Sequence, residues 1–232
     1  MKAVPRRFAA LIRHAKYHQR NNVPSAHQPF DLSEEGNCEA GAAAKLVHGL
    51  SQELDAELHP VVDTSQMLRT WRTAQILTAR LPQKNFTLES FEDLAERGVG
   101  AAANLTLTEI QLIVDGDPRY DSLPEGWKSD SNFVLPFQGA ESLMQSGERV
   151  ARHIQNRMRQ ISPENNVIKL FVGHGASFRH AAYVLGILEF KDIRTLSMHH
   201  ARPVVFELSS NCKWTHVAGN WKIRASGQPI LD

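Results

Sequence analysis

The sequence predicts a three-layer α/β/α sandwich, in which helices cover both faces of a mostly parallel central sheet. Three observations predict it. Apolar runs of strand length alternate with longer stretches of helical period, these runs end at polar or glycine-bearing turns, and 232 residues can bury a full core without disulfides. Such βαβ alternation favours parallel strands joined by crossover helices. We treat residues 1–232 as one domain with an irregular insertion at about 97–140.

The first strand and the first helix are predicted near the N-terminus. Residues 8–13 form an apolar run with the length and branching of a buried strand. A polar loop follows at about 15–31, and Ser33 can cap a helix that runs to about Leu50. That helix carries an apolar face at helical spacing, made of Ala42, Ala43, Leu46 and Leu50.

Two more strands flank a second helix. Residues 59–64 form a short apolar run that we interpret as a strand. A helix is predicted over 66–80, with Met67, Ala74, Leu77 and Leu81 on one side. Residues 86–91 alternate with period two and predict a third strand.

Residues 97–140 differ from the rest of the chain. They hold one short predicted helix at 105–114, where Thr106 and Glu109 can form a capping box. A segment this irregular inside a compact domain is more often a functional lid than a defect. Its acidic residues argue against a highly anionic substrate; they are Asp115, Asp117, Asp121, Glu125 and Asp130.

Predicted helices and strands alternate again after residue 140. An amphipathic helix is predicted over 141–161, a strand over 167–172 and an apolar helix over about 176–188. The C-terminal part predicts short, antiparallel strands at 203–208, 214–218 and 221–224.

Composition restricts the partners and the compartment. The net charge of +1 argues against a broad nucleic-acid surface, although a local anion pocket remains compatible with it. The first fifteen residues carry no apolar h-region, and no apolar run approaches about 18 residues, so we expect a cytoplasmic protein without a membrane span. Cys38 and Cys212 fit neither a disulfide framework nor a metal motif, and we expect two buried thiols.

Chemically versatile side chains follow four of the predicted strands. In chain order they are Arg13 with His14, Ser65 with Arg69, Glu96, and His174. Because parallel strands share a carboxyl edge, we expect all of them in one crevice. Arg69 falls in the first turn of its helix and Gly175 opens the helix after His174, and helix N-termini favour anions.

Such a set can bind and attack a phosphoryl group. Arg13 and Arg69 offer forked donors for its oxygens, and a preorganised donor contributes about 10²–10³ in rate. Neutral His14 can form a covalent phosphoryl intermediate. Because the two guanidinium groups disfavour its charged form, we expect an acceptor at its other ring nitrogen that fixes the tautomer.

The positions of the acidic residues in the sequence do not decide which of them is the proton donor. Glu96 is the candidate that would protonate the leaving oxygen, an effect of roughly 10²–10⁴ in rate. It competes with Glu89, Glu92 and Asp93. His14 and His18 have a metal-ligand spacing, but Ala15 stands where a zincin has Glu. We interpret four histidines as surface residues or as support for the site: His18, His27, His199 and His200.

The ordered motifs resemble the histidine phosphatase superfamily, also called phosphoglycerate mutase-like. The matching segments are Leu11-Ile12-Arg13-His14-Ala15, Leu32-Ser33-Glu34-Glu35-Gly36, Ser65-Gln66-Met67-Leu68-Arg69-Thr70-Trp71-Arg72-Thr73-Ala74, Leu94-Ala95-Glu96-Arg97-Gly98, Gly139-Ala140-Glu141-Ser142-Leu143 and Val172-Gly173-His174-Gly175. The match spans about residues 8–186, and the ordered set is specific although Arg-His alone is not.

The resemblance implies roles for individual residues. It implies that His14 becomes a phosphohistidine and that Arg13, Arg69 and His174 grip the phosphoryl group. It also implies that Glu96 is the proton donor, a choice that spacing left open. No metal or organic cofactor is needed in such a mechanism.

The chain departs from the family pattern at several positions. Ala15 replaces the usual Gly and Lys16 stands where many mutases carry Glu. Gln66 replaces a Pro, which bears on the geometry of that turn. The paired arginines with which mutases hold a phosphoglycerate are missing from 97–140, where Arg119 and Lys128 are separated from each other.

These departures favour a metal-independent phosphatase that hydrolyses a small phosphomonoester through phospho-His14. A phosphoglycerate-type mutase is the alternative. A phosphohistidine-protein phosphatase and a catalytically silent phosphate-binding scaffold are the less favoured hypotheses. We expect a small phosphorylated molecule as partner, with no nucleic acid and no membrane, and a homodimer is compatible with this interpretation.

Overall fold

The structure is a computed structural model, and it describes residues 4–24 and 26–224. Within them, a seven-stranded sheet has the order β4-β3-β5-β1-β7-β8, with β2 also paired to β5. Its strands are β1 (Arg7–Arg13), β2 (Glu57–Leu58), β3 (Val61–Ser65), β4 (Thr87–Phe91), β5 (Val167–Gly173), β7 (Pro203–Leu208) and β8 (Trp214–Ala218).

The sheet is mixed but mostly parallel. Strands β4, β3, β5 and β1 run parallel to one another. Strands β7 and β8 are antiparallel, as the sequence predicts for the C-terminal part. The register pairs Arg13 with Gly173, so the last residues of β1 and β5 lie side by side.

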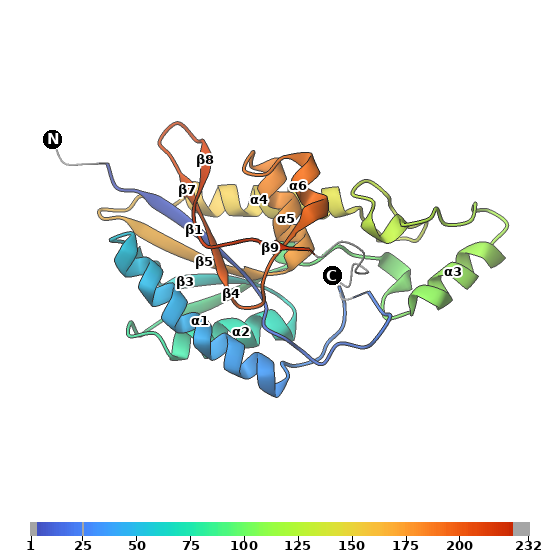
Figure 1. The fold of residues 1–232 in the computed structure, drawn as a ribbon, viewed down its shortest axis with the longest axis horizontal. Helices are drawn as coiled ribbons and strands as arrows, with labels where there is room; N and C mark the ends of the chain where they lie inside the picture. Colours follow the sequence, from blue (N-terminus) through green and yellow to red (C-terminus); the bar gives the residue numbers. More distant parts are fainter. Residues whose placement is uncertain (1–3, 25, 225–232) are drawn as a thin grey trace.

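Helices cover both faces of this sheet (Figure 1), which confirms the predicted three-layer fold. Helices α1 (Glu34–Glu53) and α2 (Leu68–Ala79) pack on one face, and α4 (Leu143–Arg159) and α5 (Gly175–Val184) on the other. Successive side chains of β1 alternate between the two hydrophobic cores: Phe8, Ala10 and Ile12 belong to the first, and Ala9 and Leu11 to the second.

Helix ends follow local chemistry. Ser33 caps α1, since its hydroxyl accepts the N–H of Gly36 at 3.1 Å. Helix α2 begins two residues later than predicted, at Leu68, because Met67 still has extended backbone. Helix α5 ends at Val184, four residues earlier than predicted, and Gly186 follows with a φ of 74° that a helix cannot continue.

The sequence missed two short elements near the C-terminus, and a third, predicted one lies in a separate sheet. Helix α6 (Phe190–Thr195) is followed directly by β6 (Leu196–Ser197). Strand β9 (Lys222–Ile223) pairs with β6 in a separate two-stranded sheet, so the strand predicted at 221–224 does not extend the main sheet. Elements of two to six residues are too short to show a period.

The 97–140 segment packs around its own hydrophobic cluster. Helix α3 (Leu107–Gly116) starts at the predicted capping box of Thr106 and Glu109. In Figure 1 it lies away from the sheet. Trp127 is buried in this cluster together with Val99, Ala102, Ile110 and Leu135, and Phe133 and Phe137 pack against it. The aromatic side chains of the segment therefore serve its own packing.

Both cysteines are exposed, so the expectation of buried thiols was wrong. Cys38 lies on a solvent-facing side of α1, and Cys212 lies in the turn before β8 with a φ of 62°. No helix in the described ranges is both long and apolar enough to cross a membrane.

Candidate active site

The two histidines leave neighbouring strands at the carboxyl edge of the sheet. His14 follows β1 and His174 follows β5, and the backbone N–H of His14 donates to the Gly173 carbonyl at 2.9 Å. Their ring centroids are 5.3 Å apart. The parallel pairing of β1 with β5 thus joins two residues that are 160 positions apart in the chain.

His14 is held in one orientation. Its Nδ1 lies 2.8 Å from the Ala15 carbonyl oxygen. A carbonyl can only accept, so Nδ1 carries the proton and Nε2 keeps its lone pair. This is the acceptor that the sequence analysis expected. Burial, and then the charges of Arg69, His174 and Arg13, hold the pKa of His14 well below its usual range, so the ring is neutral at pH 7.

Arg69 is fully buried in the first turn of α2. It donates to the carbonyls of Gln28 at 2.9 Å and Ala26 at 3.3 Å, and its guanidinium lies 4.8 Å from the Tyr17 ring centroid. One of its nitrogens lies 3.2 Å from Nδ1 of His174. Arginine cannot accept a proton there, so Nδ1 of His174 is the acceptor in this pair.

The other nitrogen of His174 is bound by Ser65. Since Nδ1 accepts from Arg69, Nε2 of His174 carries the proton and donates to the Ser65 hydroxyl at 2.8 Å. Ser65 contacts the Thr70 hydroxyl at 2.8 Å and accepts the Met67 N–H at 3.3 Å. These bonds form the turn in which Gln66 replaces the family's Pro. Burial and the charges of Arg69 and Arg13 lower the pKa of His174 well below its usual range.

The side chain of Arg13 lies against Gly175, the first residue of α5. Its guanidinium donates to the Met198 carbonyl at 3.1 Å. A Cβ at Gly175 would lie 3.2 Å from both Cδ and Nε of Arg13, closer than most side-chain contacts. The missing side chain at the start of α5 therefore allows the guanidinium to lie against that helix end.

Glu96 is bound to the same helix N-terminus. Its carboxylate accepts the backbone N–H groups of Ser177 at 2.9 Å and Ala176 at 3.2 Å, in the first turn of α5. The three competing acids lie elsewhere. Glu89 pairs with Arg157 at 2.6 Å, and Glu92 and Asp93 are exposed. The structure therefore brings together Arg13, His14, Arg69, Glu96 and His174, with Gly175 beside them.

Sequence reasoning missed several residues that support this site. Tyr17 packs edge-on against His14, with the ring centroids 5.3 Å apart. His200, which the sequence analysis interprets as a surface residue or as support for the site, has its ring centroid 5.7 Å from that of His14. The Thr73 hydroxyl accepts the Ala15 N–H at 3.0 Å, and buried Gln28 supplies a carbonyl to Arg69. Of these, Gln28 lies in a loop without periodicity. Only the proximity of Tyr17 to the Arg-His pair could have signalled its role.

A cavity of about 640 Å³ opens beside Glu96 and Ala176. Its wall includes residues of the 97–140 segment, α5 and α6. Five of its lining side chains are basic, namely Arg97, Lys128, Arg179, Arg194 and Arg224, and three are acidic, namely Glu96, Glu125 and Asp130. The arginines of α5, α6 and the chain after β9 were not foreseen from the acidic composition of residues 97–140.

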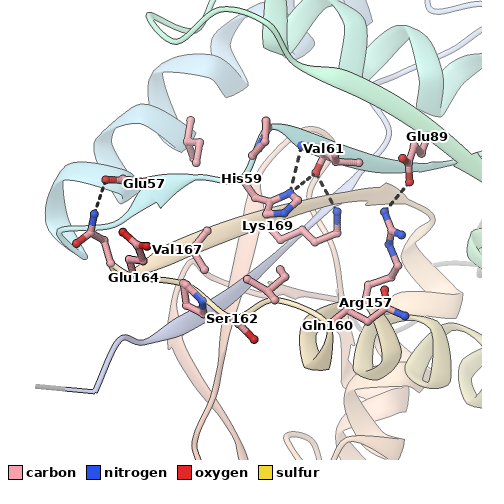
Figure 2. A pocket seen from close by; sticks show the side chains of 15 residues that line it. Glu57, His59, Val61, Glu89, Arg157, Gln160, Ser162, Glu164, Val167 and Lys169 are labelled. Carbon is pink, nitrogen blue, oxygen red and sulfur yellow. Dashed lines mark hydrogen bonds and ion pairs between the residues drawn. The ribbon is translucent and has the colours of Figure 1, made fainter.

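A second cavity of about 640 Å³ lies at the opposite, amino ends of β3 and β5 (Figure 2). Lys169 and Arg157 line it, and both are engaged by protein groups: Lys169 donates to the Val61 carbonyl at 2.9 Å and Arg157 binds Glu89 at 2.6 Å. No predicted site residue lies there. Across the described part of the chain, no group of three or more His, Cys, Asp or Glu side chains is arranged to hold a metal ion.

Comparisons with known proteins agree with this geometry. The family model of the histidine phosphatase superfamily (branch 1) matches residues 9–221. A 2,3-bisphosphoglycerate-dependent phosphoglycerate mutase of Methylobacterium sp. (strain 4-46) is 27% identical over 88% of this chain and 93% of its own.

Solved structures share the fold at low identity. A phosphoglycerate mutase from Bacillus anthracis str. Sterne superposes with a TM-score of 0.71 at 17% identity, covering 93% of both chains. The α-ribazole phosphatase from Shigella flexneri superposes with a TM-score of 0.68 at 17% identity, covering 92% of this chain and 96% of its own. A mycobacterial glucosyl-3-phosphoglycerate phosphatase superposes with a TM-score of 0.64 at 18% identity, covering 94% of this chain and 97% of its own. With the family model spanning nearly the whole chain, this protein belongs to the histidine phosphatase superfamily, branch 1.

Proposed function

We propose that this protein is a phosphatase that hydrolyses a small phosphomonoester through a covalent phosphohistidine at Nε2 of His14. One observation carries the proposal: Nδ1–H of His14 donates to the Ala15 carbonyl, which leaves the Nε2 lone pair available in a ring that burial and nearby cations keep neutral. A neutral imidazole amid guanidinium groups is suited to attack a phosphate dianion.

In the first step, the Nε2 lone pair forms the P–N bond while the ester P–O bond breaks. The protonated Glu96 carboxyl gives its proton to the leaving oxygen, which departs as an alcohol. Arg13 and Arg69 bind the phosphoryl oxygens, and the backbone N–H of Gly175 at the start of α5 adds a further donor. His174 joins them in its other tautomer, in which Nδ1–H donates to a phosphoryl oxygen instead of accepting from Arg69 and Nε2 accepts from the Ser65 hydroxyl. Stabilising charge on the transferring group is most of what this chemistry requires.

In the second step, water attacks phosphorus and the electron pair of the P–N bond returns to Nε2 of His14. The Glu96 carboxylate takes the proton of the attacking water and is ready for the next cycle. Its backbone bonds to Ala176 and Ser177 keep it beside the phosphoryl site in both steps.

Hydrolysis is favoured over mutase activity by the 97–140 segment. A mutase must hold its substrate between two transfers, and this segment offers the separated Arg119 and Lys128. Arg119 is engaged by Asp117 at 2.6 Å. The mutase is nevertheless the second candidate, because sequence relatives from Methylobacterium and Methylocella silvestris carry that name.

Product analysis with 3-phosphoglycerate separates the two activities. We expect inorganic phosphate to appear faster than the 2-isomer, in the absence of added bisphosphoglycerate and in its presence. Isomer formation that outpaces phosphate release would establish the mutase instead. A panel of sugar, nucleotide, carboxylate and amino-alcohol phosphates then ranks the substrates.

A further inference from the structure

The proton donor of the proposed mechanism stands on a segment without regular structure. Residues 95–98 follow the short helix η1 (Glu92–Leu94) and belong to no helix or strand. Glu96 nevertheless keeps its carboxylate on the N–H groups of Ala176 and Ser177. A proton donor must stay within hydrogen-bond reach of the leaving oxygen, so contacts from outside this segment have to hold its backbone.

Arg149 of α4 binds the backbone on the N-terminal side of Glu96. Its Nη1 donates to the carbonyls of Asp93 at 2.8 Å, Glu92 at 3.2 Å and Ala95 at 3.3 Å. Hydrogen bonds from a charged donor are stronger than those between neutral groups. Three carbonyls that converge on one guanidinium group therefore fix the turn that leads into Glu96.

Glu141 binds the backbone on the C-terminal side of Glu96. Its Oε1 accepts the N–H of Gly98 at 3.0 Å, and its own N–H donates to the Gly98 carbonyl at 3.0 Å. The same Oε1 accepts Nη2 of Arg149 at 2.6 Å, so one ion pair joins the contacts on the two sides. Only 17% of the Arg149 side chain and 24% of the Glu141 side chain are exposed, so water screens this pair only in part.

The start of α4 explains why these two residues meet. The mechanism above leaves the family motif at 139–143 without a role. Within this motif, Ser142 caps α4 and Glu141 directly precedes the cap, beside Gly98. Arg149 follows about two helical turns later, on the side of α4 that contacts η1. The helix thus presents an anion and a cation to the two flanks of one short segment.

We propose that Arg149 and Glu141 are positioning residues that clamp the backbone before and after Glu96 and thereby aim its carboxyl at the leaving oxygen. The inference deepens the proposed function and rests on the role of Glu96 as proton donor. Neither positioning residue exchanges a proton with the substrate. Their effect on the reaction is therefore exerted through Glu96 alone.

Leaving groups separate positioning from a merely structural role. Arg149→Gln should lower kcat/KM about 10–100-fold for an alkyl phosphate, the cost of a displacement of about 1 Å. For p-nitrophenyl phosphate, whose leaving oxygen needs no proton, the loss should be at most about 3-fold. Arg152→Gln is the matched control on the same helix, because Arg152 is exposed, and it should leave both values unchanged.

Two outcomes of this comparison would overturn the inference. Arg149 also adds to the charges that lower the pKa of His174, after burial and the charges of Arg69 and Arg13. An effect through His174 or through general stability would reduce kcat/KM equally for both substrates. In the Glu96→Gln background, Arg149→Gln should cost little more, because both changes remove one function. Equal losses for the two substrates, or losses that multiply in the double variant, would refute positioning.

Glu141 provides a second pair of variants. Glu141→Gln keeps an oxygen that can accept from both Gly98 and Arg149, so most activity should remain. Glu141→Ala loses both bonds and should reproduce the leaving-group dependence of Arg149→Gln. Equal losses in the two variants would show that the charge of Glu141 matters rather than the place of its oxygen, against the inference. This pair remains informative even if Arg149→Gln does not fold.

Amide hydrogen exchange separates this inference from the proposed function. The N–H of Ser177 donates to Glu96, so its exchange rate reports the position of that carboxylate without turnover. Arg149→Gln should accelerate exchange at Ser177 about tenfold, the effect of losing one hydrogen bond, and Arg152→Gln should not. Unchanged exchange would refute the clamp even if the protein is a phosphatase. Faster exchange in a protein that hydrolyses no phosphomonoester would support the clamp and refute the proposed function.

Discussion

The two ends of the sheet both concentrate buried basic side chains, but they use them differently. At the amino end, Asp63 is fully buried and is bound by Lys169 at 2.7 Å, Arg157 at 2.8 Å and His153 at 2.9 Å. Glu89 adds a second carboxylate to Arg157 at 2.6 Å (Figure 2). In this cluster, the protein supplies a counter-charge for each lysine and arginine.

At the carboxyl end, Arg13 and Arg69 donate to backbone carbonyls and Arg69 also to His174. The carboxylate nearby, Glu96, is bound to the N–H groups of α5. Burial, and then the positive charges of these arginines, lower the pKa of both His14 and His174. We interpret the difference as one of use: the matched charges of the amino end stabilise the fold, whereas our proposal assigns the cations of the carboxyl end to a phosphoryl group.

The largest effect should come from the nucleophile. His14→Ala should lower kcat by at least about 10³-fold, because no other group in the site can form the covalent intermediate. Steady-state phosphate release measures it, and thermal unfolding of the same protein checks that the buried position still packs. A variant with more than a tenth of the wild-type activity would show that His14 is not the nucleophile.

Glu96→Gln should slow hydrolysis by roughly 10²–10⁴-fold with poor leaving groups, because the proton donor is lost. With an activated leaving group such as p-nitrophenolate, the loss should be smaller, since protonation is no longer needed in the first step. Glu92→Gln is the matched control, as this exposed neighbour lies outside the site. Because Glu96 also acts as base in the second step, the comparison uses kcat/KM, which reports the first step. Equal losses of kcat/KM for both leaving groups would refute the role of Glu96 as the donor.

At the amino end, Asp63→Asn should cost about 3–5 kcal/mol of unfolding free energy, because it leaves the buried charge of Lys169 without its carboxylate partner, whereas Arg157 keeps Glu89. Urea unfolding followed by circular dichroism measures it. Asp93→Asn serves as control, since that carboxylate is 59% exposed and 3.9 Å from His153. If both variants lost the same small amount, the cluster would not be a stabilising element.

The same cluster predicts a pH dependence of stability. Burial alone would raise the pKa of Asp63, but hydrogen bonds from His153 and Arg157 and the charge of Lys169 outweigh it and lower the pKa. A carboxyl with a depressed folded-state pKa stabilises above its unfolded pKa of about 4, and this contribution is lost as pH falls through the folded value. The stability difference between wild type and Asp63→Asn should therefore be full at pH 7 and shrink below about pH 4. A difference that grows with acidification would contradict the sign.

The smallest effect concerns the orientation of His174. Ser65→Ala removes the acceptor of its Nε2 proton and should lower kcat by about 5–10-fold, the equivalent of one hydrogen bond of about 1 kcal/mol. Ser90→Ala is the matched control, because that hydroxyl binds Thr64 at 2.9 Å in the neighbouring strand. The pH profile of kcat should change only in Ser65→Ala, whereas a merely structural role would alter stability and leave the profile unchanged.

The sequence predicted much of the fold because its signals are local. The run at residues 8–13, the Ser33 cap and the box of Thr106 and Glu109 each act within a few residues, and the structure has all three. Parallel pairing then brings Arg13, His14 and His174 together, since Arg13 and Gly173 are in register.

Other parts of the site depend on contacts between distant segments. The sequence does not place Arg194 and Arg224 beside Glu96, because they line the same cavity only after α6 and the β6–β9 pair have formed. Likewise, Lys169 stands in the middle of an apolar strand, and its partner Asp63 is recognised only when β3 lies beside β5. Short elements do not show a periodic pattern of apolar residues, and ion pairs between distant segments give no local signal in the sequence.

Rapid-quench analysis with a phosphomonoester labelled in its phosphoryl group tests the central claim most directly. The account predicts an acid-labile, alkali-stable phosphoryl group on His14 that forms at least as fast as turnover and is absent from His14→Ala. Turnover without phosphorylation of His14, or phosphorylation slower than turnover, would contradict it.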